Sequence, residues 1–312
     1  MSILPNAMGD AAETPPQAMA PTMSPTSSFY WSVRRELWEN RSIYIAPLIV
    51  MAVVLFASLI STISLPHKMR NLPTLDPAKR HAAVVTHYSV APAPIMLATF
   101  LVGFFYCLDA LHGERRDRSI LFWKSLPVSD RTAVLSKASI PIVILPVIAF
   151  VLSAVTLVVL LMAGTAILFL SRMSPATLWS ELRFFQEPVI MVYGLTVHAL
   201  WFAPIYCWLL LVSAWARRAT FLWALLPWFA AAALERIAFS TSYFGSMLRY
   251  RVIGGMTEAF ANQQHGSGEI LDQLSQLSPA RFLGAPGLWV GLLFAAACLA
   301  GAVRLRHDRE PI

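Results

Sequence analysis

The sequence ASIPIVILPVIAFVLSAVTLVVLLMAGTAILFLS, residues 138–171, contains no charged side chain and decides the fold class. An α-helix rises ~1.5 Å per residue, so roughly 20 apolar residues cross the ~30 Å hydrocarbon core of a bilayer. This run is longer than one crossing requires. We therefore expect a membrane span over about 139–165 that either tilts or extends past the bilayer.

Five further apolar runs lead to the same interpretation, at about 43–65, 91–111, 188–215, 220–240 and 286–303. Hydrophobic residues make up 57% of the 312-residue chain and charged residues 13%, about half the ~25% charged content of a soluble domain. The sequence thus predicts an all-α, polytopic membrane protein with six transmembrane helices. Pro146 and Pro204 lie inside spans and are expected to kink them.

The charged residues gather in short runs at the ends of the apolar stretches. The net charge of +7 therefore reflects membrane topology and gives no indication of nucleic-acid binding. Cys107, Cys207 and Cys298 all fall inside apolar runs, which argues against a disulfide framework or a thiolate metal site.

The distribution of Lys and Arg predicts the orientation. They are denser in the segment before the first span, in 112–137, at Arg217-Arg218 and after the last span than in the longer alternate loops. Both termini are therefore expected in the cytoplasm, with 307–312 as a tail there and 241–285 as the longest outer loop. In that loop, Ile270, Leu271, Leu274 and Leu277 predict a short amphipathic helix that stops near Pro279.

The chain before the first span divides into two parts. Residues 1–27 hold five prolines and no Lys or Arg, which predicts a disordered tail, with Met19 or Met23 as alternative natural starts. Residues 28–41, SFYWSVRRELWENR, place Phe29, Tyr30, Val33, Leu37 and Trp38 on one helical arc, and Ser32, Arg35, Glu36 and Glu39 on the other side. An amphipathic helix in the membrane interface fits this pattern; the first, hydrated turns of the next span are the alternative.

A charged island, HGERRDRSILFWKSLPVSDRTAVLSK, covers residues 112–137 between the second and third spans. It carries six Lys or Arg residues around an apolar cluster at 120–123 and a Leu126-Pro127 break. The chain has no phosphate-binding G-x-x-x-x-G-K-[ST] loop, no H-E-x-x-H and no G-x-S-x-G. We therefore expect no catalytic residue, no metal site and no cofactor site in this chain.

Three features inside the spans are candidates for function. His198, near the middle of its span, is either a proton-relay or substrate contact, or a neutral imidazole bonded to a neighbouring helix. Glu235 and Arg236 either line the outer mouth of a pathway or extend to the interface. Gly287, Gly291 and Ala295 predict a close helix approach, within the chain or between two chains.

The island resembles the cytoplasmic loop between spans 2 and 3 of ABC-2-type transporter permeases. That loop often reads E-R-x-x-[GS]-[ST]-[LI], then L-P-[VIL]-S, then G-K before the next span. Glu114, Ser119-Ile120-Leu121, Leu126-Pro127-Val128-Ser129 and Lys137 match it. Arg118-Ser119 stands where the family often has a small pair, and Ser136 where it has glycine. The likeness covers about 28–306, a single permease domain.

The resemblance implies the membrane subunit of a bacterial ABC exporter in the cytoplasmic membrane. Such a permease pairs with a second, identical or different, permease chain and with separate ATPase subunits, which bind ATP and magnesium. A coupling helix in this loop would dock on the ATPase, with a contact set of Glu114, Arg115, Arg116, Arg118, Ser119, Ile120, Phe122, Trp123, Leu126, Pro127 and Ser129. Alternatively, Phe122 and Trp123 lie on the membrane and the arginines meet anionic lipid.

Two other functional classes stay open. An ion-coupled carrier or intramembrane enzyme would need paired ionisable groups inside the spans, where His198 stands nearly alone. A non-transporting membrane anchor or sensor would signal through the 112–137 loop. Only the transporter requires a partner ATPase.

Overall fold

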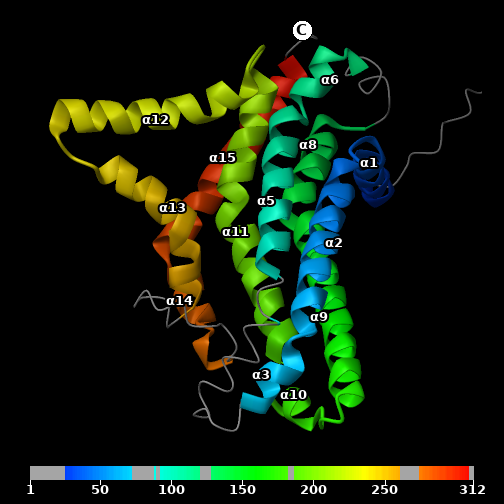
Figure 1. Ribbon diagram of the computed structural model, residues 1–312. Coiled ribbons are helices and arrows are strands. Elements are labelled where there is room, and N and C mark those ends of the chain that lie inside the picture. Colours follow the sequence, from blue (N-terminus) through cyan, green and yellow to red (C-terminus); the bar gives the residue numbers. More distant parts are fainter. Residues whose placement is uncertain are drawn as a thin grey trace, which may run out of the picture.

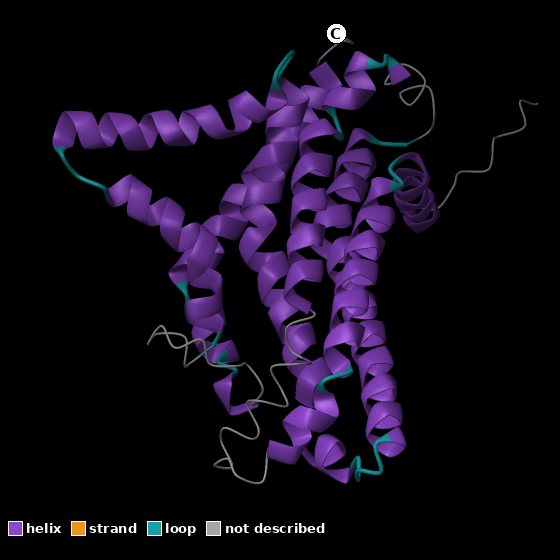
Figure 2. Ribbon diagram, in the orientation of Figure 1, coloured by secondary structure: helices purple, strands orange, loops and turns teal. Residues whose placement is uncertain are grey.

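The described part of the protein is helical in the computed structural model, with no strand among the described residues 25–71, 88, 92–119, 128–181, 186–260 and 274–308 (Figure 2). The helices are α1 (Pro25–Glu39), α2 (Ser42–Thr62), α3 (Leu65–Asn71), α5 (Pro92–Asp109), α6 (His112–Arg116), α8 (Asp130–Ser139), η2 (Ile140–Ile144), α9 (Leu145–Leu170), α10 (Ala176–Glu181), α11 (Gln186–Trp215), α12 (Thr220–Phe239), α13 (Tyr243–Ala259), η4 (Leu274–Gln276), α14 (Pro279–Gly284) and α15 (Pro286–Asp308).

Six of these helices are long and apolar enough to cross a membrane, within Ser42–Thr62, Pro92–Arg116, Asp130–Leu170, Gln186–Trp215, Thr220–Phe239 and Pro286–Asp308. They coincide with the six predicted spans, so the all-α, multi-span prediction is confirmed at this level. Their exposed side chains are mainly apolar, as for Phe56, Phe105 and Val290, which suits a protein embedded in a membrane.

The central helix of the bundle is α11, which packs against α5, α13 and α15 (Figure 1). In its most apolar window 56% of the residues are buried, against 6% in α12. Trp201 and Tyr206 are among the largest fully buried side chains. The aliphatic and aromatic stripes of α11 therefore form the core on which the other helices are arranged.

The helix α12 forms over the predicted range but runs outward from the bundle, crosswise to α2, α5, α9 and α11, and α13 leads back toward α11 (Figure 1). Ala219, with a left-handed φ of 52°, turns the chain out of α11. At the other end of α12, the Glu235 carboxylate accepts hydrogen bonds from the backbone N–H groups of Tyr243 and Phe244 at 2.6 and 2.7 Å. Glu235 thus caps the start of α13 and fixes the elbow.

The third span continues a helix that begins well before the apolar run. Residues Asp130–Leu170 form one helical stretch of 41 residues, with a π-helical turn over Ile140–Ile144. Pro141 lies in that turn and Pro146 immediately after it. Because proline cannot donate a backbone hydrogen bond, the two prolines account for the irregular helix that the sequence predicts near Pro146.

The small residues of α15 accommodate side chains of α13. A Cβ added at Gly287 would lie 2.8 Å from the Tyr250 ring, and one at Gly291 would meet the Arg251 guanidinium. Arg251 donates to the carbonyl oxygens of Gly287 and Trp201, and the Trp201 indole donates back to the Arg251 carbonyl at 2.7 Å. At Gly287 and Gly291 the small residues of α15 therefore leave room for side chains of α13, whereas the helix that α15 packs along is α11.

The segment 241–285 differs from the prediction in where helix forms. The structure has α13 over Tyr243–Ala259, which the sequence did not indicate, a single 3-10 turn over Leu274–Gln276, and α14 starting at Pro279 where a helix was expected to stop. Ile270 and Leu271 of the predicted helix lie outside the described residues, as does most of the predicted tail 1–27. Residues 25–27 of that tail belong to α1, so helix starts before the predicted boundary.

Candidate functional site

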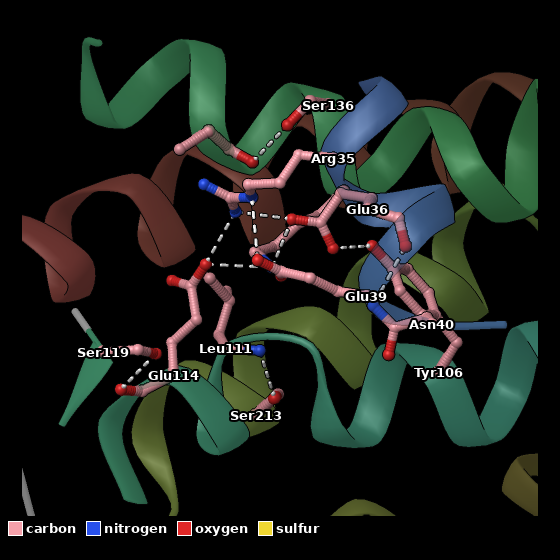
Figure 3. Close-up of polar contacts among 12 residues, drawn as sticks. Arg35, Glu36, Glu39, Asn40, Tyr106, Leu111, Glu114, Ser119, Ser136 and Ser213 are labelled. Carbon is pink, nitrogen blue, oxygen red and sulfur yellow. Dashed lines mark hydrogen bonds and ion pairs between the residues drawn. The ribbon is translucent and has the colours of Figure 1, made fainter. Parts of the chain in front are cut away.

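A buried cluster of charged residues lies at the end of the bundle that holds α6 and the last turns of α15; we call this the charged end. Five helices contribute to the cluster, which Figure 3 shows in part. Its members are Arg35 and Glu36 of α1, Tyr106 of α5, Glu114 of α6, Lys137 and Asp130 of α8, and Arg306 of α15. The opposite end, with α3 and α10, is called the far end.

Glu36 is the most enclosed carboxylate of the cluster, with no exposed side-chain surface. Lys137 Nζ lies 2.8 Å and Arg35 Nη2 2.7 Å from its Oε1, and the Tyr106 hydroxyl donates to its Oε2 at 2.8 Å. Burial alone would raise the pKa of Glu36, but the charges of Lys137 and Arg35 and the donated hydrogen bonds outweigh burial and lower that pKa below its ordinary value. Glu36 is therefore ionised at neutral pH.

Glu114 shares its cations with Glu36. Its Oε1 lies 3.1 Å from both Arg35 Nη2 and Lys137 Nζ, and its Oε2 accepts from Arg306 Nη2 at 3.2 Å. Arg306 also approaches Asp130 Oδ1, at 3.5 Å. Each of the two buried carboxylates thus faces at least two cations, and these offset the free-energy cost of removing a charged group from water.

The short helix α6 is also tied to the end of α11. Arg115, 4% exposed, donates from Nη1 to the carbonyl oxygens of Ala214 and Ala216 at 2.7 and 3.4 Å. The Ser213 hydroxyl oxygen accepts from the backbone N–H groups of Leu111 and His112. A cation on the last carbonyls of a helix is a favourable cap, so α6 has a fixed position on the central helix.

These contacts attach both ends of the 112–137 island to the bundle. Glu114 lies near its start and Lys137 at its end, and both reach Arg35 or Glu36 of α1. Across the described residues, no group of three His, Cys, Asp or Glu side chains could hold a metal ion. The arrangement consists of buried charge pairs that join α1, α6 and α8.

The predicted partner-contact residues of the island separate into four groups. Glu114 and Arg115 are buried within the chain. Arg116 and Arg118 are exposed, Arg116 near Asp109 and Asp117, while Ser119 donates to the Glu114 carbonyl oxygen and Ser129 caps α8 by accepting from the Thr132 N–H. Ile120, Phe122, Trp123, Leu126 and Pro127 lie outside the described residues.

The predicted pathway residues do not come together. His198 lies among aromatic rings, with its Nε2 3.2 Å from the Tyr206 hydroxyl of the same helix and its ring 4.6 Å from Phe202. It borders a cavity of only about 10 Å³, room for one water at most. Glu235 caps α13, and Arg236 lies beside it on the exposed part of α12.

Sequence reasoning missed Glu36, Tyr106 and Arg306 as members of the site. The helical wheel placed Ser32 and Glu36 opposite the apolar arc, but both are buried against the bundle, while Tyr30, Trp31 and Trp38 are exposed. The available signal was the position of the charges: Glu36, Lys137 and Arg306 each border an apolar span at the same predicted end. Charges that neighbour one another at span ends are candidates for pairing.

Comparisons with models of known families, with curated proteins and with solved structures find no match to this chain.

Proposed function

We propose that this chain is the membrane permease subunit of an ATP-driven ABC-2-type transporter, an exporter, whose ATPase is a separate subunit that docks on the 112–137 island. The observation that carries the proposal is the attachment of both ends of the island to one buried charge cluster. Glu114 and Lys137 connect the island directly to α1, and the Tyr106–Glu36 hydrogen bond extends this connection to α5. Lys137 also belongs to the helical stretch that continues into α9. That is the connection a coupling segment needs.

The proposal includes a topology. The charged end faces the cytoplasm, with both termini, and α1 lies in the interface of a bacterial cytoplasmic membrane. The density of Lys and Arg at this end supports the orientation. The exposed aromatic residues Tyr30, Trp31 and Trp38 on α1 support the interfacial position, since Trp and Tyr favour the headgroup region.

The partners follow from the same resemblance. A second permease chain completes the transport unit, and the ATPase subunits bind ATP and magnesium, which this chain does not. Phe122 and Trp123 would enter a groove on the ATPase, and the exposed Arg116 and Arg118 would meet acidic groups around it.

The test is co-purification of the full-length chain from its native membrane with an ATP-hydrolysing subunit. We expect the double variant Phe122→Ala/Trp123→Ala to lose that subunit while remaining in the membrane. Phe169→Ala is the matched control, because Phe169 is 77% exposed at the end of α9 toward the far end. Absence of any ATPase from the wild-type preparation would refute the transporter assignment; an ATPase retained equally by all variants would refute docking through Phe122 and Trp123.

A further inference from the structure

A groove of about 810 Å³ opens at the charged end between α8 and the last turns of α15. Its lining changes character along its length. The polar part of the lining lies toward the helix ends and consists of Ser129, Asp130, Arg131, Arg304, His307 and Asp308. The apolar part, with Leu135, Leu299 and Val303, lies further toward the middle of the bundle. The groove is therefore charged at one end and apolar at the other.

On both helices that line the groove, the charged residue lies nearer the charged end and the apolar residues lie further in. Helix α8 starts at the charged end and α15 finishes there, so their residues run in opposite directions along the groove (Figure 1). Arg131 and Leu135 are one helical turn apart on α8, and Arg304 follows Leu299 and Ala300 by about one turn on α15. On both walls the change from cation to hydrocarbon thus takes place within about 6–8 Å.

The charged residues that line the groove differ in whether another charged group of the chain already pairs with them. Asp130 is engaged by Arg306 at 3.5 Å and lies 3.4 Å from His307 Nδ1. Arg304 meets Asp308 only at 3.9 Å, with 87% of its own side chain exposed, and an exposed pair of this kind contributes little. Arg131 has no ion pair among the described residues. Two arginines therefore remain accessible to an anion.

We propose that this groove binds an anionic phospholipid, with the phosphate at Arg131 and Arg304 and an acyl chain along Leu135, Leu299 and Val303. The occupant follows from complementarity: an accessible pair of guanidinium groups suits a phosphate, and the apolar floor belongs to helices long and apolar enough to span a membrane. A free phosphate would leave Leu135, 49% exposed, uncovered. The inference requires only membrane embedding and is independent of the transporter proposal.

The test compares binding of phosphatidylglycerol and phosphatidylcholine to the full-length chain in mild detergent, by native mass spectrometry. We expect phosphatidylglycerol to bind more tightly to the wild type, and Arg131→Gln/Arg304→Gln to weaken its binding about tenfold. Arg217→Gln/Arg218→Gln is the matched control, since it removes the same charge from exposed positions between α11 and α12. This control should retain wild-type binding.

Two further measurements separate the headgroup and chain contributions. Leu135→Asn should weaken phosphatidylglycerol binding without changing the net charge, and excess inorganic phosphate should fail to displace the lipid. Equal binding of both lipids, or equal losses in the two arginine pairs, would overturn the proposal. So would unchanged lipid binding with loss of a co-purifying protein in Arg131→Gln/Arg304→Gln, which would identify the groove as a protein contact.

Discussion

Lys137 Nζ lies 2.8 Å from Glu36 Oε1 across 101 residues of sequence, and 97% of the lysine side chain and all of the glutamate side chain are buried. The pair connects the helix before the first span with the helix that becomes the third. Glu36 also accepts a hydrogen bond from Tyr106, and Lys137 also forms an ion pair with Glu114. The Lys137–Glu36 pair is therefore part of a network and is not an isolated salt bridge.

Removal of one partner of this pair should destabilise the protein strongly. Lys137→Met leaves Glu36 buried without its nearest ammonium, and breaking a buried pair in this way typically costs about 3–5 kcal/mol. We expect a lower midpoint of thermal unfolding in detergent. Arg218→Met, at an exposed position between α11 and α12, is the control and should unfold like the wild type. A Lys137→Met variant as stable as that control would contradict the assigned role.

The lowered pKa of Glu36 predicts an acid-sensitive contribution to stability. The folded-state pKa lies below the ordinary value of 4.5, so the ionised carboxylate stabilises the fold at neutral pH. This contribution is lost as the pH falls from about 4.5 through the folded pKa. Unfolding midpoints measured from pH 7 downward should stay level to about pH 5 and then fall. Glu36→Gln should be less stable at neutral pH and show a smaller acid-induced decrease.

The contact between α11 and α13 should not tolerate a methyl group at Gly255. A Cβ there would lie 2.7 Å from Cγ of the buried Trp201 ring, and overpacking of this kind costs about 1–3 kcal/mol. Gly245→Ala in the same helix is the control, since nothing lies within 4 Å of its Cβ position. That substitution should be neutral or stabilising by about 0.5–1 kcal/mol. Thermal unfolding of both variants decides the matter, and equal midpoints would argue against this packing.

The guanidinium of Arg115 should be needed to hold α6 on α11. Arg115→Gln removes the hydrogen bonds to the carbonyl oxygens of Ala214 and Ala216, so the amides of α6 should exchange faster with deuterium. Arg116→Gln, at an exposed neighbouring position, is the control and should exchange like the wild type. Similar exchange in both variants would show that Ser213 and the ion pairs of Glu114 hold the helix without the Arg115 guanidinium.

Loss of the Glu235 carboxylate should release the start of α13. Glu235→Ala removes the acceptor for the N–H groups of Tyr243 and Phe244, a helix cap of the kind that contributes about 1 kcal/mol. Faster exchange of the first α13 amides should follow, while Arg236→Ala leaves them unchanged. Unaltered amide exchange in Glu235→Ala would show that the Glu235 carboxylate does not fix the α12–α13 elbow.

Hydropathy predicted the lengths of the spans well, because lipid solubility is a property of each segment alone. The run at 188–215 corresponds to α11 at Gln186–Trp215, and that at 220–240 to α12 at Thr220–Phe239. The direction of each helix relative to the bundle was not predictable from hydropathy. The outward course of α12 depends on the turn at Ala219 and on the cap from Glu235, and neither feature affects the hydropathy of a segment.

The site was predictable only in part. The motif located Glu114 and Lys137, but the cations and anions that pair with them come from positions 79, 101 and 192 residues away. Amphipathic periodicity placed Glu36 on the polar side of its helix and could not distinguish water from a buried cation as its neighbour. In a bundle end of this kind, burial of a charge depends on which helices meet there.

The helical stretch Asp130–Leu170 has a further consequence. At ~1.5 Å per residue its 41 residues extend about 60 Å, roughly twice the hydrocarbon thickness of a bilayer. The stretch has a short arm, Asp130–Ser139, which carries Lys137, and a long arm, Leu145–Leu170, which ends at the far end. The π-helical turn at Ile140–Ile144 lies between the two arms. A rotation about this turn would displace the far end of α9 more than the charged end, because the arm that leads to the far end is the longer one.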